Sequence, residues 1–267
     1  MLKDITLGQY FPGNTVVHRL DPRTKLLMVI VYIVALFLAK WWISYGVMLA
    51  FLVTAVVLSR IKPKALFKGL KPLLIIIIFT AFINLFYTDG EELVHFWIFR
   101  ITREGVVQAV FLVLRIMMLV SGTFLLTYTT SPIALTDGLE SLLSPLKKLR
   151  FPVHELAMMM SIALRFIPTL IEETDKIISA QKARGADFET GNLFRRAKAL
   201  IPILVPLFVS AFRRADELAT AMECRCYHGG EGRTKLKQLR YHTRDALTFL
   251  LGAALLGGII ALRCFGL

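Results

Sequence analysis

Long apolar runs separated by short charged segments limit what this chain can fold into. The runs cover residues 26–39, 43–58, 73–87, 105–128 and 246–262. Hydrophobic residues make up 56% of the chain, whereas about 45–50% is usual in soluble domains. A helix satisfies its own backbone in lipid and needs about 20 apolar residues to cross a bilayer. The sequence therefore predicts an all-α integral membrane protein with about five transmembrane helices.

The first two runs are separated only by Lys40, Trp41 and Trp42. A single long helix through both runs is one interpretation. We favour two spans joined by a tight turn, because tryptophan prefers the membrane interface. The first span would then be short, and tilt or local thinning of the bilayer would accommodate it. Asp21 is a good N-cap and Pro22 suits the first helical position, so a helix is expected to begin there.

The positions of the basic residues indicate the orientation in the membrane. They are concentrated in the N-terminal arm and in the segment around Pro63: Lys3, Arg19, Arg23 and Lys25, then Arg60, Lys62, Lys64, Lys68 and Lys71. Because basic loops stay in the cytoplasm, the N-terminus and residues 129–244 are expected there. The net charge of +13 could also indicate a nucleic-acid binder. We place that hypothesis third and expect no nucleic-acid partner, because the charges avoid the apolar runs.

The chain is expected to have three parts. Residues 1–128 would form an N-terminal arm and four transmembrane helices, 129–244 a cytoplasmic module, and 245–267 a last transmembrane helix. The module would contain a short helix to about residue 149 and two long helices, at 152–184 and 193–227, with apolar residues at helical spacing. Prolines at 168, 202 and 206 are expected to bend the long helices.

The two long helical segments end alike. Ala183-Arg184-Gly185 closes the first, and a shift of 41 residues places it on Cys224-Arg225-Cys226 at the end of the second. One arginine in a last helical turn needs no other purpose than to offset the helix dipole, by ~0.3–1 kcal/mol. The repeat favours a second interpretation, in which two exposed guanidinium groups make forked hydrogen bonds to a partner with two similar halves.

The sequence contains no clear motif for catalysis or for metal binding. There is no P-loop pattern, so we expect no ATP hydrolysis by this chain alone and no cofactor. Cys224, Cys226 and His228 are too few for a zinc site, which normally needs four ligands, so we expect no metal. Arg115 lies inside the fourth apolar run, where a charge normally faces protein or water. Structural pairing and a direct role in a mechanism are both open for it, so a self-contained secondary transporter or channel with Arg115 in its pathway is the alternative function.

With these motifs the chain resembles the transmembrane T component of energy-coupling factor (ECF) vitamin transporters, which is related to the cobalt-transport membrane proteins. The resemblance covers nearly the whole chain. The matching segments are Leu20-Asp21-Pro22-Arg23-Thr24-Lys25, residues 139–152, Ala163-Leu164-Arg165-Phe166-Ile167-Pro168 and Ala183-Arg184-Gly185. Cys224-Arg225-Cys226 keeps the arginine of the second family signature but not its small flanking residues.

The resemblance implies partners and a mechanism. A T component joins two ABC-type ATPase subunits, the same or different, to a membrane S component that captures the vitamin. The two signature arginines insert into grooves on the ATPases. The long coupling helices cross under the membrane, and their apolar face holds the S component. In this chain the implied ATPase-coupling residues are Ala183, Arg184, Gly185, Cys224, Arg225 and Cys226, and the implied S-component contacts are Met160, Ala163, Leu164 and Ile167.

Overall fold

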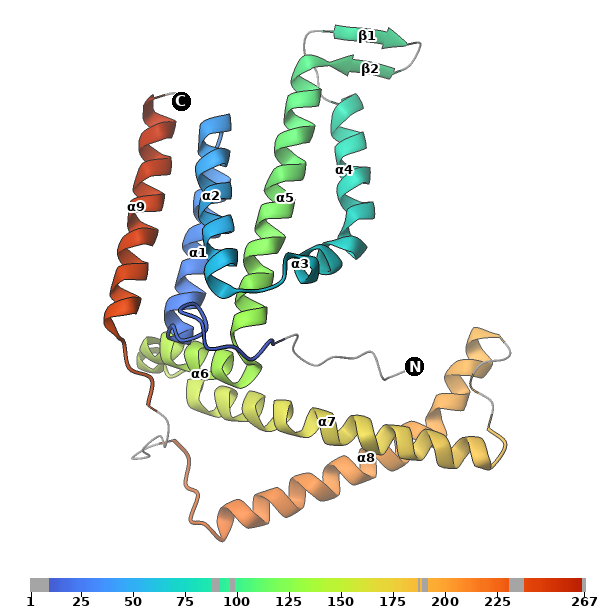
Figure 1. The fold of residues 1–267 in the computed structure, drawn as a ribbon. Coiled ribbons are helices and arrows are strands. Elements are labelled where there is room, and N and C mark those ends of the chain that lie inside the picture. Colours follow the sequence, from blue (N-terminus) through green and yellow to red (C-terminus); the bar gives the residue numbers. More distant parts are fainter. Residues whose placement is uncertain are drawn as a thin grey trace. The chain divides into compact units, whose positions relative to one another are not determined.

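The computed structural model describes residues 10–87, 92–96, 99–186, 188, 192–230 and 238–265. They are helical apart from the N-terminal arm, one short hairpin and the connecting segments (Figure 1). This confirms the all-α prediction. The elements are α1 Pro22–Leu38, α2 Trp42–Ser59, α3 Pro63–Leu70, η1 Lys71–Leu73, α4 Leu74–Tyr87, β1 Glu92–Phe96, β2 Phe99–Thr102, α5 Arg103–Thr129, α6 Pro132–Leu143, η2 Ser144–Leu149, α7 Val153–Ala183, α8 Leu193–Glu223 and α9 Thr243–Phe265.

Two elements were not expected from the sequence. The basic segment around Pro63 is not a loop, because Pro63 starts the helix α3 and Leu66 and Leu70 bury one side of it. The segment before α5 contains the antiparallel hairpin β1–β2, in which Val94 pairs with Ile101. Valine, isoleucine and phenylalanine favour strands, and a hairpin is short enough to fit between two helices.

The chain divides into two compact units, and the boundary falls within α6. Gly8–Gly138 and Leu239–Leu267 form the membrane unit, in which α1 packs against α5 and α9, and α4 packs against α5. Leu139–Gln238 forms the crossed-helix unit, in which α7 packs against α8. The last helix of the chain therefore belongs to the same unit as the first.

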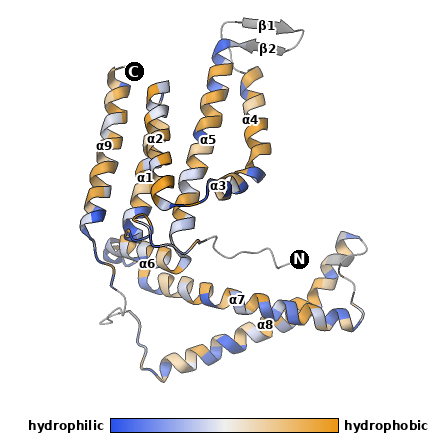
Figure 2. Cartoon of the chain, viewed as in Figure 1, coloured by the Kyte–Doolittle hydropathy of each residue, from blue (hydrophilic) through white to orange (hydrophobic). Residues whose placement is uncertain are grey.

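Five helices in the described part of the chain are long and apolar enough to cross a membrane. They are Trp42–Ser59, Pro63–Phe86, Arg103–Thr129, Val153–Ala183 and Thr243–Phe265. The predicted set differs in one member. It contained the first helix, α1, which has only 17 residues, and it did not contain α7. Hydrophilic and hydrophobic residues alternate along α7 and α8, whereas α4 is hydrophobic along most of its length (Figure 2).

The turn between the first two helices follows the prediction. α1 ends at Leu38 and α2 begins at Trp42, so the two apolar runs form separate helices. At 1.5 Å per residue α1 is about 26 Å long, slightly less than the ~30 Å of a hydrocarbon core. The prediction of a short first helix is therefore confirmed.

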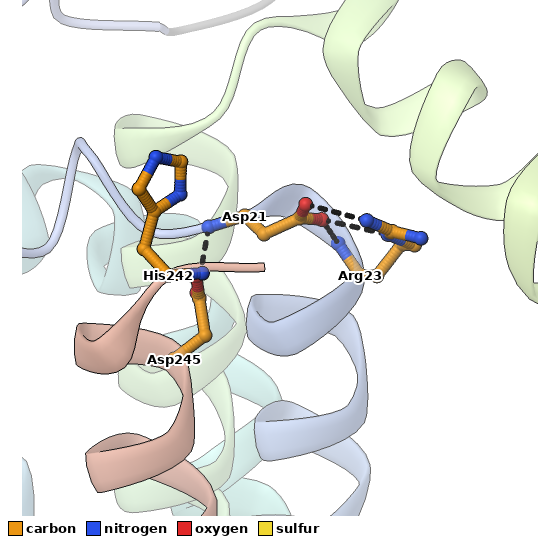
Figure 3. Close-up of polar contacts among 4 residues, drawn as sticks. All are labelled: Asp21, Arg23, His242 and Asp245. Carbon is orange, nitrogen blue, oxygen red and sulfur yellow. Dashed lines mark hydrogen bonds and ion pairs between the residues drawn. The ribbon is translucent and has the colours of Figure 1, made fainter. Parts of the chain in front are cut away.

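One buried carboxylate joins the starts of α1 and α9 (Figure 3). Asp245 is 1% exposed, and it accepts hydrogen bonds from the backbone N–H of Asp21 at 2.9 Å and of His242 at 2.8 Å. Both donors stand just before the first turn of a helix, where backbone N–H groups lack intrahelical partners. A single side chain therefore pairs with backbone N–H groups at the start of two helices, and Asp245 lies 224 residues after Asp21 in the chain.

Asp21 acts as the predicted N-cap of α1. Its carboxylate accepts from the backbone N–H of Arg23 at 2.9 Å and from the Arg23 guanidinium at 2.9 and 3.0 Å. Burial opposes ionisation of Asp21, but the hydrogen bonds from Arg23 outweigh it and hold the pKa of this carboxyl below its usual value. The guanidinium of Arg23 also lies 4.0 Å from the centre of the Tyr241 ring, so the segment before α9 contacts α1 a second time.

Two cations fix α5 against its neighbours. The buried Lys25 in α1 donates from Nζ to the carbonyl of Thr129 at 2.9 Å and to Thr130 Oγ1 at 3.2 Å. Arg115 in α5 donates from Nε to the Tyr45 hydroxyl at 2.9 Å and from Nη2 to the carbonyl of Ala39 at 3.4 Å. Ala39 follows the last turn of α1, so Arg115 pairs with a carbonyl at the negative end of a helix. These contacts favour structural pairing as the role of Arg115.

The shared carboxylate gives a first prediction. Asp245→Ala leaves the buried N–H of Asp21 and the partly buried N–H of His242 without this acceptor, and a buried group left unpaired costs about 1–3 kcal/mol. We expect the free energy of unfolding of the full chain to fall by about 2–4 kcal/mol, measured by denaturant titration in detergent micelles. Asp216→Ala, which removes an exposed carboxylate from α8, is the matched control and should change it little. Equal losses in both variants would contradict the assigned role.

Candidate functional site

The end of α7 is a rigid turn that exposes an arginine. The N–H of Gly185 donates to the carbonyl of Lys182 at 3.0 Å, and the N–H of Ala186 donates to that of Gln181 at 3.0 Å. This pair of bonds is a Schellman motif, and it requires a left-handed residue after the cap. Gly185 supplies it with φ +84°, and Arg184 is the capping residue. The turn thus occupies the last carbonyls of α7 and leaves the Arg184 side chain exposed.

The end of α8 repeats this hydrogen-bond pattern 41 residues later. Cys226 N–H donates to the carbonyl of Glu223 at 2.8 Å, and Tyr227 N–H donates to that of Met222 at 3.1 Å. Arg225 therefore stands where Arg184 stands in the first turn, and Cys226 takes the place of Gly185. The predicted helix end at residue 227 is wrong by four residues, because this turn already ends the helix at Glu223.

Cys226 is in the left-handed conformation, with φ +54°. For a residue with a Cβ atom this conformation costs roughly 1–2 kcal/mol, a cost that glycine avoids. This strain was not predicted from the sequence, because no glycine next to Arg225 indicates a left-handed position. The surrounding hydrogen bonds hold the turn in the same geometry as the glycine version.

The structure exposes all six residues that were predicted to couple to ATPases. Ala183, Arg184, Gly185, Cys224, Arg225 and Cys226 all have exposed side chains or backbone. Neither arginine side chain makes a hydrogen bond or ion pair to another described residue. Cys224 and Cys226 are free thiols, and nowhere in the described ranges do three His, Cys, Asp or Glu side chains gather as a metal site would require.

One ion pair marks the crossing of α7 and α8. Arg214 Nη2 lies 3.0 Å from Glu173 Oε2, and its guanidinium carbon lies 5.8 Å from the centre of the Phe166 ring. Further along, the Gln181 side chain donates to the carbonyl of Pro202 at 3.4 Å. Later residues of α7 thus meet earlier residues of α8, so the helices run in opposite directions, and Figure 1 shows them crossing.

The ion pair joins equivalent positions of the repeat, since Glu173 and Arg214 are 41 residues apart. Arg184 follows Glu173 by 11 residues, and Arg225 follows Arg214 by the same 11. At 1.5 Å per residue each arginine lies about 16 Å from the pair, in opposite directions. The crossing therefore has local two-fold character, with one arginine tip at each end.

The helical arms between the ion pair and the tips contain no proline. Pro168 in α7 and Pro202 and Pro206 in α8 all precede the crossing residues of their helices. Since a proline removes one backbone hydrogen bond and bends a helix, the bends are confined to the first halves. The segments from Glu173 to Arg184 and from Arg214 to Arg225 are called the arms from here on, and they contain no proline.

The predicted apolar contact face lies on the first half of α7. Met160 is 43% exposed and Ala163 is also exposed, whereas Leu164 and Ile167 are half-buried. α8 continues the apolar character with exposed side chains on its middle part: Leu200, Ile201, Leu204, Val205, Phe208, Val209 and Phe212. Apolar faces of this size mark contact with another protein or with lipid.

The Glu173–Arg214 pair was not predicted from the sequence. The signal that could have found it is the repeat itself, because the shift of 41 residues that aligns the arginines also aligns Glu173 with Arg214.

A charge swap tests this pair. Glu173→Arg and Arg214→Glu each place like charges at the crossing, and each is expected to lower the free energy of unfolding by about 1–2 kcal/mol. The double variant restores opposite charges and should recover most of the loss, measured by denaturant titration of the full chain. Additive losses in the double variant would show that the two side chains do not interact.

The sequence is similar to those of known membrane proteins over nearly its whole length. The sequence profile of the family described as "Cobalt transport protein" matches residues 13–236. The chain is 56% identical to the energy-coupling factor transporter transmembrane protein EcfT of Acidaminococcus fermentans, over 96% of this chain and 95% of that protein. It is 54% identical to EcfT of Thermosediminibacter oceani, over 98% and 99%, and 49% identical to EcfT of Bacillus subtilis, over 96% and 98%. The chain therefore belongs to the EcfT family of energy-coupling factor transporter transmembrane proteins.

Proposed function

We propose that this membrane protein is the coupling subunit, or T component, of an ECF-type importer for vitamins or other micronutrients. In this role it carries ATP-driven motion from two ABC-type ATPase subunits to a membrane S component that binds the substrate. The observation that carries the proposal is the pair of identical Schellman turns that expose Arg184 and Arg225 on opposite sides of one ion pair. The chain itself is not an enzyme in this proposal.

The two tips would contact the two ATPases, which are the same or different proteins. A guanidinium forms forked hydrogen bonds with carboxylates or carbonyls. Because a rigid turn already holds its backbone in one place, little conformational entropy is lost on binding. The local two-fold character of the crossing suits a partner with two similar halves. A flexible loop could present an arginine too, but it would not transmit a displacement into the helix.

The apolar side chains of α7 and α8 would hold the S component. Met160 and Ala163 are exposed on α7, one turn apart, and Leu164 and Ile167 extend the same face at helical spacing. A face of this kind can bind another apolar helix without specific polar contacts, which fits a partner that moves during each cycle.

The proposed orientation places the N-terminus and the crossed-helix unit in the cytoplasm. It rests on the basic residues of the N-terminal arm and of the segment 60–71, which follow the positive-inside rule. In this orientation α7 lies at the membrane surface and does not span, although its length and composition would allow it to. The charged residues along its second half, among them Glu172, Glu173 and Lys176, support the surface position.

The alternative is a self-contained secondary transporter or channel that uses Arg115. The contacts of Arg115 with the Tyr45 hydroxyl and the Ala39 carbonyl speak against it, because a pathway residue would need to change partners. Substrate uptake by the purified chain alone in liposomes, without ATPases, would favour this alternative.

Reversing the charge at both tips tests the ATPase contact. Arg184→Glu with Arg225→Glu should abolish co-purification of the ATPases and reduce vitamin uptake to less than about a tenth, because each lost charged pair costs 2–5 kcal/mol. Arg184→Ala alone should give a partial loss, since one tip remains. Lys176→Glu with Arg213→Glu makes the same charge change on the same helices away from the tips and should leave both measurements intact. Normal uptake by the tip variant would refute the proposal.

A charge on the apolar face tests the S-component contact. Ala163→Glu buries a carboxylate in the proposed contact and should weaken S-component binding at least about tenfold, while the ATPases stay bound. Thr169→Glu introduces the same charge at an exposed position on the other side of α7 and serves as the control. The measurement is the amount of S component that co-purifies with the tagged chain, and full retention in Ala163→Glu would rule out this face.

A further inference from the structure

Two adjoining hollows in the membrane unit differ sharply in chemistry. The first, called the basic cleft, has a volume of about 940 Å³ and lies between residues 11–18 of the N-terminal arm and residues 57–65. The second, called the apolar groove, has a volume of about 360 Å³ and is lined by residues of the arm, α1, α2, α5 and α9. Val16 and Leu58 line both, so the two hollows meet.

The apolar groove has the walls that an alkyl chain would contact. Its lining is almost entirely apolar and includes Phe51, Ala55 and Leu251. Gly122 and Tyr32 form one closely packed part of this lining, because a Cβ atom on Gly122 would come within 2.7 Å of the Tyr32 ring. Lys25 also lines the groove, but its amino group already donates to three acceptors. Since lipid tails are as apolar as these walls, the groove supplies shape, and selectivity has to come from a headgroup.

The basic cleft supplies charge for such a headgroup. Arg60 and Lys62 line it with exposed side chains, and none of its described lining residues is acidic. Both follow directly after α2, whose 18 residues extend about 27 Å, close to the ~30 Å of a hydrocarbon core. The two cations therefore stand at the depth where lipid phosphates lie. Arg244, which lines the groove at the start of α9, adds a third positive charge.

The opposite wall of the cleft is already formed. His18 Nδ1 lies 2.7 Å from Thr15 Oγ1, and His18 Nε2 lies 3.0 Å from the carbonyl of Phe11, so both ring nitrogens hold the arm in its turn. Gly13 packs against this ring, where a Cβ atom would approach within 2.9 Å. A wall that is already formed lowers the conformational entropy that the protein loses when a ligand binds.

We propose that the basic cleft and the apolar groove together bind one anionic phospholipid, with its phosphate against Arg60 and Lys62 and one acyl chain beside Leu58 in the groove. The cations select the headgroup and the groove selects a chain-bearing ligand over a soluble phosphate. This site is separate from the arginine tips, and its ligand is neither the transported substrate nor the S component.

Native mass spectrometry of the full chain in mild detergent tests the site. The protein is incubated with equal amounts of dioleoyl phosphatidylglycerol and dioleoyl phosphatidylcholine, and the retained lipid is counted. We expect one retained phosphatidylglycerol with about a tenfold preference over phosphatidylcholine, from two cations at the membrane surface. Arg60→Asn with Lys62→Gln should abolish the preference. Asparagine is chosen because it tolerates the left-handed conformation of Arg60, whose φ is +54°.

Two further variants separate charge from shape. Lys68→Gln with Lys71→Gln removes the same charge from the same basic segment outside the cleft, and it should keep the preference. Thr54→Trp fills the groove from an exposed position and should lower retention of both lipids without reversing their order. The proposal is overturned if the preference survives in the cleft variant, if the control loses it equally, or if millimolar inorganic phosphate displaces the lipid from the wild-type chain.

Discussion

The crossed-helix unit depends on the ion pair between Glu173 and Arg214. About a quarter to a third of each side chain is exposed, at 25% and 30%, so the pair contributes only about 1 kcal/mol to stability. The pair matters more for the position at which α7 and α8 cross. Two long amphipathic helices with apolar faces can slide along each other at small cost, and a single charged contact fixes where they cross. Once that point is set, the positions of Arg184 and Arg225 follow from the rise of the helix.

The membrane unit solves a different problem, since it must satisfy polar groups where water is scarce. Asp245 accepts from the backbone that precedes two helices, Lys25 donates to the end of α5, and Arg115 donates to the end of α1. Each charged side chain is paired with a helix terminus, where backbone groups lack partners of their own. Charges paired in this way hold the helix ends together and leave the helix surfaces free for lipid.

Sequence reasoning found the elements that depend on local chemistry. Asp21 with Pro22 marked a helix start, Gly185 marked a helix end, and the tryptophans marked the turn between two helices. It missed features that the preferences of single residues do not indicate. α3 forms because Leu66 and Leu70 are buried in the membrane unit, the hairpin before α5 forms because β1 pairs with β2, and Cys226 adopts a strained conformation within the hydrogen bonds of its turn. The Glu173–Arg214 pair could have been predicted, because the repeat that aligns the two arginines also aligns these two residues.

The equal length of the two arms has a mechanical consequence. An arm of about 16 Å turns by roughly 4° when its tip moves by about 1 Å, because a short rigid lever converts small shifts into visible rotation. Because the two arms are equally long, equal forces on both tips change the angle between α7 and α8 without displacing the crossing point. A force on one tip alone would instead rotate the two helices together. For the coupling role proposed above, the angle between α7 and α8 would therefore report whether both tips are bound at the same time.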